Sequence, residues 1–205
     1  MFIYDLVGTE QNGPYQNLAA ENLARQYTFL RSVVEASIDL NQCVLSIEAL
    51  KALNYHAIAC LHFSAGAFRP CEVKVGDHQP PPHFQVPALM QMFTNQVNRI
   101  WDESDPVTLA AYVLWRLNHI HPFVNGNGRT ARAACHLILC MKLGGWLPGD
   151  TILPELLRAN RARYVEALKH ADASLAVGLP DLAPLHRLLS ELLDQQLKSA
   201  NIAQG

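Results

Sequence analysis

The chain has 205 residues, half of them hydrophobic, with 16 basic and 18 acidic side chains and a net charge of −2. This size and apolar content suit one folded domain with a buried core. The charge balance gives no general attraction to nucleic acid or to an anionic membrane, so any phosphate binding must be local. The sequence has no apolar stretch long enough to span a membrane and no pattern of a cleavable signal, which predicts a cytoplasmic protein.

Cysteine and histidine spacings indicate neither a disulfide framework nor a metal site. The five cysteines are odd in number and mostly have apolar neighbours, which favours reduced thiols. Two histidine pairs, His56 with His62 and His119 with His121, lack the spacing of four residues and the companion carboxylate of a metal site. His56, His62 and His119 are therefore expected to be polar residues near helix ends.

The expected elements, in chain order, are helices joined by short loops. Apolar residues recur with helical spacing in the segments 17–40, 46–65, 86–103, 105–119, 127–142, 158–172 and 184–197. Asp105 followed by Pro106 is typical of a helix start, and Gly144 of a helix stop. The sequence therefore predicts a mostly α-helical fold.

One segment departs from the helical pattern. Residues 71–82 contain the alternating run Cys-Glu-Val-Lys-Val, then Gly76-Asp77, then three prolines. Alternation followed by turn residues predicts one small β-hairpin and no larger sheet.

Residues 121–132 read His-Pro-Phe-Val-Asn-Gly-Asn-Gly-Arg-Thr-Ala-Arg. Gly126 and Gly128 let backbone N–H groups approach an anion, and a helix starting there favours negative charge at its first turn. Arg129 and Arg132 are three residues apart, so both can reach phosphate oxygens. His121 is a candidate proton acceptor. The stretch therefore predicts a phosphate site.

Three other interpretations of this stretch are weaker. The spacing of the glycines fits the dinucleotide fingerprint, but that motif requires a preceding strand, and segment 105–119 reads as a helix. The phosphate-loop motif fails because its four-residue gap and its lysine are missing. A plain turn between helices would explain the glycines. It gives no reason for the flanking His-Pro-Phe or for the two arginines.

The stretch closely resembles the signature of Fic proteins, His-Pro-Phe-x-(Asp/Glu)-Gly-Asn-Gly-Arg-x-x-Arg, and matches it everywhere except at Asn125. Residues 61–69 and 73–81 resemble the segment before the Fic flap and the flap itself, and residues 160–168 a later helix. The resemblance implies a single-domain Fic-type helical bundle over residues 41–200, with the hairpin as its flap and an N-terminal helical segment over residues 1–40.

The resemblance also implies an activity. Fic proteins transfer a nucleotidyl group, most often AMP from ATP with Mg²⁺, to a Ser, Thr or Tyr hydroxyl of a target protein. His121 would be the general base. The phosphate-binding residues would be Gly126, Asn127, Gly128, Arg129 and Arg132. Tyr164 and Asp172 match positions near the base and the nucleoside, although a buried structural role accounts for Tyr164 equally well. The flap residues Val73, Val75, Gly76 and His78 would receive the target.

Asn125 stands where the family has the carboxylate that binds Mg²⁺. An amide still offers an oxygen but lacks the charge that attracts the ion. Three outcomes stay open: weaker metal-dependent transfer, a changed phosphate donor, or nucleotide binding without catalysis. The intact His121 and the two arginines favour the first two. A kinase-like reaction and a pure nucleotide-binding module are the rival functions.

Many Fic proteins carry an inhibitory helix whose glutamate pairs with the second signature arginine. The best-placed candidate here is the segment 35–41, with Glu35 or Asp39 as the acidic residue, and it matches the family pattern poorly. Both could simply be exposed acidic residues on an amphipathic helix. A separate antitoxin-like partner is the third alternative.

Overall fold

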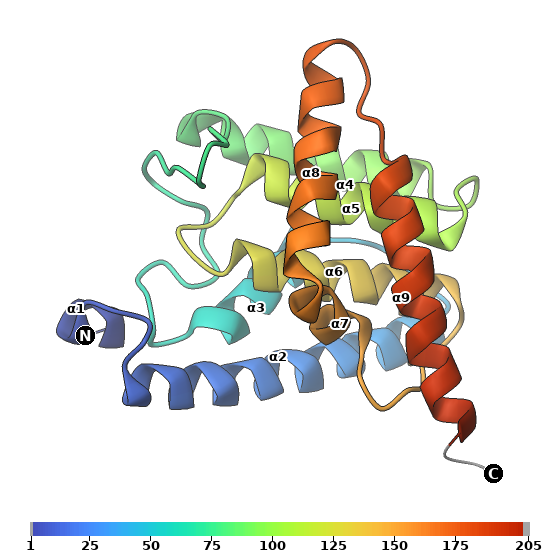
Figure 1. Ribbon diagram of the computed structural model, residues 1–205, viewed down its shortest axis with the longest axis horizontal. Helices are drawn as coiled ribbons and strands as arrows, with labels where there is room; N and C mark the ends of the chain where they lie inside the picture. Colours follow the sequence, from blue (N-terminus) through green and yellow to red (C-terminus); the bar gives the residue numbers. More distant parts are fainter. Residues whose placement is uncertain (1, 203–205) are drawn as a thin grey trace.

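The computed structural model describes residues 2–202, and almost all regular structure in them is helical (Figure 1). The helices are α1 (Ile3–Val7), α2 (Gly13–Asp39), α3 (Ile47–Ile58), η1 (His83–Gln85), α4 (Val86–Arg99), α5 (Pro106–Ile120), α6 (Asn127–Lys142), α7 (Leu153–Ala159), α8 (Arg161–Ala176) and α9 (Ala183–Ile202). The mostly α-helical prediction is confirmed. In this part of the chain, no helix is both long and apolar enough to cross a membrane.

Helices α5 and α6 form the centre of the molecule. From Thr130 to Met141, α6 is buried at every position except Arg132, as expected for a helix that is apolar on nearly all sides. The long helix α2 runs along one side of this pair, and α8 and α9 lie across it (Figure 1). The loop that joins the two central helices carries residues 121–126, so the predicted phosphate site is held by the most buried part of the fold.

The N-terminal segment packs against residues 60 and 61, where the sequence predicts that the helix over residues 46–65 continues. The helix expected over residues 46–65 ends at Ile58, and Cys60 takes a φ of 61°. The turn exposes backbone carbonyls that accept N–H groups of the short helix α1, Ile3 to Cys60 at 3.0 Å and Tyr4 to Leu61 at 3.1 Å. Helix α1 has only five residues, little more than one helical turn, so apolar periodicity in the sequence does not reveal it.

The helix expected over residues 158–172 is α8, which begins at Arg161, and a separate short helix, α7, precedes it. Helix α7 has Pro154 in its first turn, and the chain bends at Asn160 (φ −97°, ψ 34°) before α8 begins. The bend directs α8 back across α5. It therefore brings the first residues and the middle of α8 over the α5–α6 loop.

The expected hairpin is reduced to its tip. A single antiparallel bridge joins Val75 and His78 around Gly76, whose φ is 57°. Prolines 80–82 follow and lack backbone N–H donors, so a longer ladder cannot form. We call residues 71–82 the flap.

Candidate functional site

A cavity of about 850 Å³ lies between the flap, the end of α5, the start of α6 and helix α8. Its lining includes eight residues that the sequence singled out: Val75, Gly76, His78, His121, Gly128, Arg132, Tyr164 and Asp172. Four basic side chains also line it: Arg132, Arg158, Arg161 and Lys169. A pocket of this size with a cationic wall suits an anionic ligand with an apolar part.

His121 ends α5 in a left-handed conformation, with φ 51° and ψ 59°. Pro122 disfavours the helical conformation for the residue before it, and histidine tolerates positive φ better than most side chains. The ring Nδ1 lies 3.3 Å from the carbonyl oxygen of Asn118. Because a carbonyl only accepts, this contact places the proton on Nδ1 and leaves the Nε2 lone pair free to act as a base.

Burial sets the charge of this ring. The pKa of His121 is lowered to about 4, mainly by desolvation and also by the nearby His78 and Arg69, although the Asn118 contact opposes the shift. The imidazole is therefore neutral at pH 7, which is the form that accepts a proton. Bound phosphate groups would add negative charge and raise this pKa toward neutrality.

Tyr164 supports His121 through Asn118. The Asn118 side-chain nitrogen donates to the Tyr164 hydroxyl and to the carbonyl of Leu114, both at 2.7 Å. Tyr164 is buried, and desolvation raises its pKa far above the ordinary range. Tyr164 is thus a neutral side chain that fixes the last turn of α5.

The first turn of α6 presents free backbone donors. The first backbone hydrogen bond within the helix runs from Thr130 to the Gly126 carbonyl at 2.9 Å, and among the described residues no side chain caps the helix. The N–H groups of Asn127, Gly128 and Arg129 are therefore open, and the helix dipole favours an anion there.

Only glycine fits at Gly126. Its φ is 76°, and a Cβ there would lie 2.6 Å from Cγ2 of Ile58 and 3.0 Å from the side-chain nitrogen of Asn54. The close approach presses the loop against α3. The sequence predicts this glycine for the approach of an anion, and its close neighbours on α3 show that it is also needed for packing.

The side chain of Asn127 holds the signature loop together through two hydrogen bonds. Its oxygen accepts the Phe123 N–H at 2.9 Å, and its nitrogen donates to the Phe123 carbonyl at 2.8 Å. Asn127 is buried, so this leaves only its backbone N–H for phosphate. The sequence predicts a phosphate contact but cannot distinguish the side chain from the backbone.

Asn125 is committed to protein contacts. Its amide oxygen accepts the Gly126 N–H at 2.6 Å and the Arg129 guanidinium at 3.0 Å. Its nitrogen donates to the carboxylate of Glu10 at 3.3 Å. Glu10 also lies 3.5 Å from the ring of His62. No sequence pattern singles out Glu10, because the α1–α2 loop that carries it has no motif.

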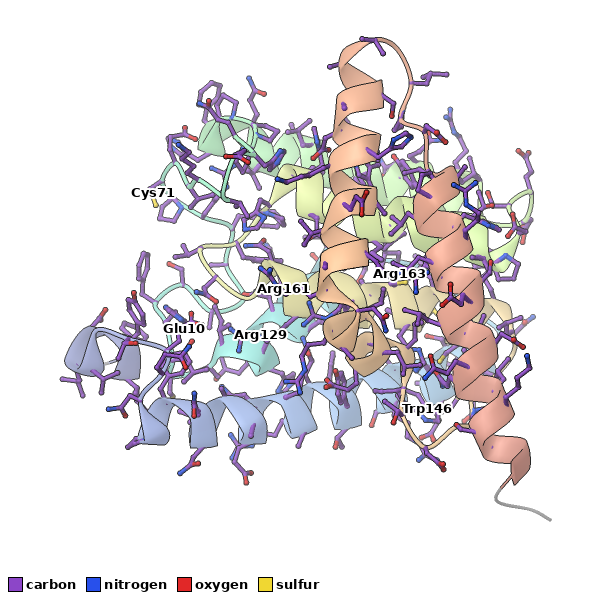
Figure 2. The ribbon with its side chains drawn as sticks, in the orientation of Figure 1. Glu10, Cys71, Arg129, Trp146, Arg161 and Arg163 are labelled. Atoms are coloured by element: carbon purple, nitrogen blue, oxygen red, sulfur yellow. The ribbon has the colours of Figure 1, made fainter. Side chains whose placement is uncertain are left out.

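The two signature arginines have different surroundings. Arg129 donates to the carbonyl of Ala57 at 2.9 Å as well as to Asn125, and it lies outside the cavity lining. Arg132 lines the cavity, and its buried Nε has no hydrogen-bond partner. An unsatisfied buried guanidinium N–H is costly unless an anion binds it. Arg161 at the start of α8 also lines the cavity, and it forms no ion pair with the described residues (Figure 2).

Residues 44–139 match the model of the Fic/DOC family. These residues form a Fic domain. A protein adenylyltransferase Fic from Drosophila persimilis is 35% identical over 133 residues, which are 64% of this chain and 24% of the fly protein. The chain thus spans about a quarter of the length of that relative.

Solved structures share the fold. Fic-1 (residues 134–508) from C. elegans superposes with a TM-score of 0.74 at 22% identity, over 98% of this chain and 56% of the worm chain. The BepC effector of Bartonella tribocorum, solved with bound AMPPNP, superposes with a TM-score of 0.53 at 14% identity, over 82% of this chain and 86% of BepC.

The flap of this Fic domain is anchored by Arg69. This buried arginine donates to the His121 carbonyl at 2.9 Å, to the Cys71 carbonyl at 3.1 Å and to the carbonyl of Pro81. One guanidinium therefore ties both ends of the flap to the end of α5. In the sequence, Arg69 stands out only as part of the segment before the flap. That Arg69 is buried and donates to three backbone carbonyls can be recognised only from the folded structure.

Asp172 faces the flap from α8. Burial alone would raise its pKa, but hydrogen bonds from His119 at 2.7 Å and from Trp115 at 2.9 Å outweigh burial and hold the pKa below its usual value. His78 of the flap lies 3.4 Å from the other oxygen of Asp172. Val73, which was also expected in the flap, lies outside the cavity lining.

The candidate regulatory residues lie near the end of α2. Glu35 pairs with Arg31 at 2.8 Å, and both side chains are exposed. Asp39 is also exposed. Neither forms an ion pair with Arg132 in this conformation, and an inhibitory role for Glu35 or Asp39 stays a prediction.

Proposed function

We propose that this Fic domain transfers AMP from ATP to a side-chain hydroxyl of a target protein. The observation that carries the proposal is that two groups line one cavity: His121, with a free Nε2, and Arg132, with an unsatisfied buried Nε. The adenylyltransferase name of the fly relative and the AMPPNP in the BepC structure support the same donor.

His121 would accept the proton of the incoming hydroxyl. As the O–H bond breaks, the oxygen bonds to the α-phosphorus of ATP. The bond from that phosphorus to the bridging oxygen breaks, and pyrophosphate leaves. The Nδ1 contact with Asn118 fixes the tautomer that this step needs, and Tyr164 in turn fixes Asn118.

The phosphates would bind at the first turn of α6. The open N–H groups of residues 127–129 offer donors, and Arg132 supplies a positive charge to the outer phosphates and the leaving pyrophosphate. Arg161 lies on the same cavity wall and adds a second cation. Arg129 contributes indirectly, because it holds Asn125 and the α3 backbone in place.

Mg²⁺ is the metal that the family implies, and Asn125 fits it poorly because its oxygen already accepts two N–H groups. Glu10 supplies a carboxylate beside it, which is the hard oxygen ligand that Mg²⁺ prefers. Glu10 and the phosphates would hold the ion, which would neutralise phosphate charge.

The flap would hold the target. Val75 and Gly76 line the cavity near His121, and a short bridge leaves flap backbone groups free to pair with an extended peptide. Pairing through the backbone would place a hydroxyl near His121 while reading little of the target sequence.

The test is incubation of the full chain with lysate and ATP labelled at the α or the γ position, followed by mass spectrometry of modified peptides. Transfer of α label that His121→Ala abolishes supports the proposal. His170→Ala is the matched control, because His170 is exposed and pairs with Asp181 away from the cavity. Transfer of γ label would show a kinase, and nucleotide binding without any label would show a binding module.

A further inference from the structure

Three potential metal ligands meet at the cavity, each from a different element. They are His78 of the flap, His119 of α5 and Asp172 of α8, and one ligand atom from each lies within 4.8 Å of the other two. Their side chains are 24%, 19% and 27% exposed, so the cluster is sheltered but reachable. In the sequence, the close spacing of His119 and His121 suggests them as a pair. In the folded chain, the neighbours of His119 are His78 and Asp172 instead.

The protonation of His78 leaves one lone pair without a donor. Its Nε2 lies 2.9 Å from the carbonyl oxygen of His119, which can only accept, so Nε2 carries the proton. In the neutral ring, Nδ1 then directs a lone pair toward an oxygen of Asp172 at 3.4 Å, which is also an acceptor. Two facing lone pairs repel each other unless a proton or a metal cation lies between them.

The surroundings match those of a metal-bound histidine. Such a histidine usually donates its other ring N–H to a backbone carbonyl or a carboxylate, as His78 does. Asp172 is oriented by the indole N–H of Trp115 at 2.9 Å. His119 Nδ1 lies 2.7 Å from the other Asp172 oxygen, so a metal would displace the proton of that contact.

We propose that His78, His119 and Asp172 bind a divalent transition-metal ion of the zinc type, which joins the flap to α5 and α8. Two imidazole nitrogens and one carboxylate suit zinc, whereas Mg²⁺ prefers oxygen ligands. In a tetrahedral zinc site neighbouring ligand atoms are roughly 3.3 Å apart. Here one ligand atom from each residue lies within 4.8 Å of the others, and the two oxygens of Asp172 lie 2.7 Å from His119 and 3.4 Å from His78, so the side chains would move closer around an ion. The fourth coordination position of the proposed metal would face the cavity.

A bound ion would change the flap more than the rest of the fold. The tip of the flap is held by one bridge, by the His78 contacts and by the exposed pair of Asp77 with Lys169. A metal bond to His78 would fix this tip over the cavity. The proposal does not depend on AMP transfer, because it concerns metal binding and flap motion alone.

The test is a zinc titration of the full chain against a chromogenic chelator, in a Cys60→Ser, Cys71→Ser background. Both cysteines are exposed, and Cys71 lies in the flap (Figure 2), so their thiols would otherwise compete. We expect one saturable site, and His78→Ala and Asp172→Asn should each weaken it by about tenfold or more. His83→Ala is the matched control, because His83 pairs only with the exposed Glu72.

Hydrogen exchange of residues 74–79 is the second measurement. Zinc should slow exchange there in the parent chain and in His83→Ala, but not in His78→Ala, while thermal melts show that each variant is folded. The proposal is overturned if the parent binds no zinc below the millimolar range. Equal zinc affinity of the parent and the His78 and Asp172 variants would also overturn it.

Discussion

The carboxylate of Glu10 lies 3.3 Å from the amide nitrogen of Asn125, although the two residues are 115 positions apart. Asn125 is the one departure from the Fic signature, at the position where the family has an acidic side chain. The α1–α2 loop brings Glu10 beside it, on the same side of the molecule as Arg129 (Figure 2). A negative charge is thus present next to the signature loop, but from another part of the chain.

The first prediction concerns this charge. Glu10→Gln keeps a polar contact with Asn125 but removes the carboxylate, so the Mg²⁺ concentration at half-maximal transfer should rise several-fold. Glu21→Gln, an exposed change on α2, should leave it unchanged. Asn125→Asp in the Glu10→Gln background should restore transfer at low Mg²⁺. Mg²⁺ titrations of α-label transfer measure all three.

The same titration can contradict this reading of Asn125. If Asn125→Asp and Asn125→Glu lower transfer at every Mg²⁺ concentration, then a carboxylate there repels the donor, and altered donor chemistry replaces the weakened-metal explanation.

The second prediction concerns His121. Because the ring acts on the hydroxyl and not on the nucleotide, His121→Ala should abolish transfer, including self-modification, and leave ATP affinity within a few-fold. Calorimetry with ATP and α-label transfer separate the two quantities. Transfer at the parent rate would remove His121 from the mechanism.

The third prediction separates the two arginines. Arg132→Ala removes a cation that lines the cavity, so ATP affinity should fall about ten- to a hundred-fold, equivalent to about 1.5–3 kcal/mol, and the preference for ATP over ADP should shrink. Arg129→Ala breaks contacts with Ala57 and Asn125 and should instead lower the melting temperature. An unchanged ATP to ADP ratio in Arg132→Ala would show that this residue does not read the terminal phosphate.

The fourth prediction concerns pH and His136. This histidine is fully buried, neither ring nitrogen has a partner, and desolvation lowers its pKa to about 4 from the ordinary value of 6.5. Because the unfolded chain binds the proton more readily, stability is complete above pH 6.5 and falls as pH drops toward 4, by roughly 3 kcal/mol for this group.

His136→Leu should therefore flatten the pH dependence of the unfolding free energy between pH 6.5 and 4 and raise stability at pH 7, since an unsatisfied polar group is removed. Urea unfolding at several pH values measures both effects. Parallel curves for the parent and the variant would mean that His136 does not contribute to acid destabilisation.

The fifth prediction concerns the flap. Deleting residues 76–79 removes its tip but spares Arg69 and the α6 loop, so target modification should fall strongly while ATP affinity is kept. Equal loss of modification and of ATP binding would indicate a folding defect instead of a target-binding role.

The sequence by itself determined the helical class, the central pair of helices and the signature loop. Apolar spacing reports burial along one helix, and turn residues report backbone conformation, so both are local properties. The same locality explains the errors. The helix expected to reach residue 65 stops at Ile58, because the α1 segment and the loop at Gly126 pack there.

Only the tertiary structure decided which side chains share the site. The sequence predicts Asn127 as a phosphate ligand, but in the fold its side-chain amide is hydrogen-bonded to the backbone of Phe123. Glu10 sits in a loop without a motif and becomes relevant through one contact across the fold. His78, His119 and Asp172 meet because the bend at Asn160 directs α8 over α5 and the flap folds back between them. These contacts between distant side chains depend on the relative positions of whole helices, which no local sequence pattern specifies.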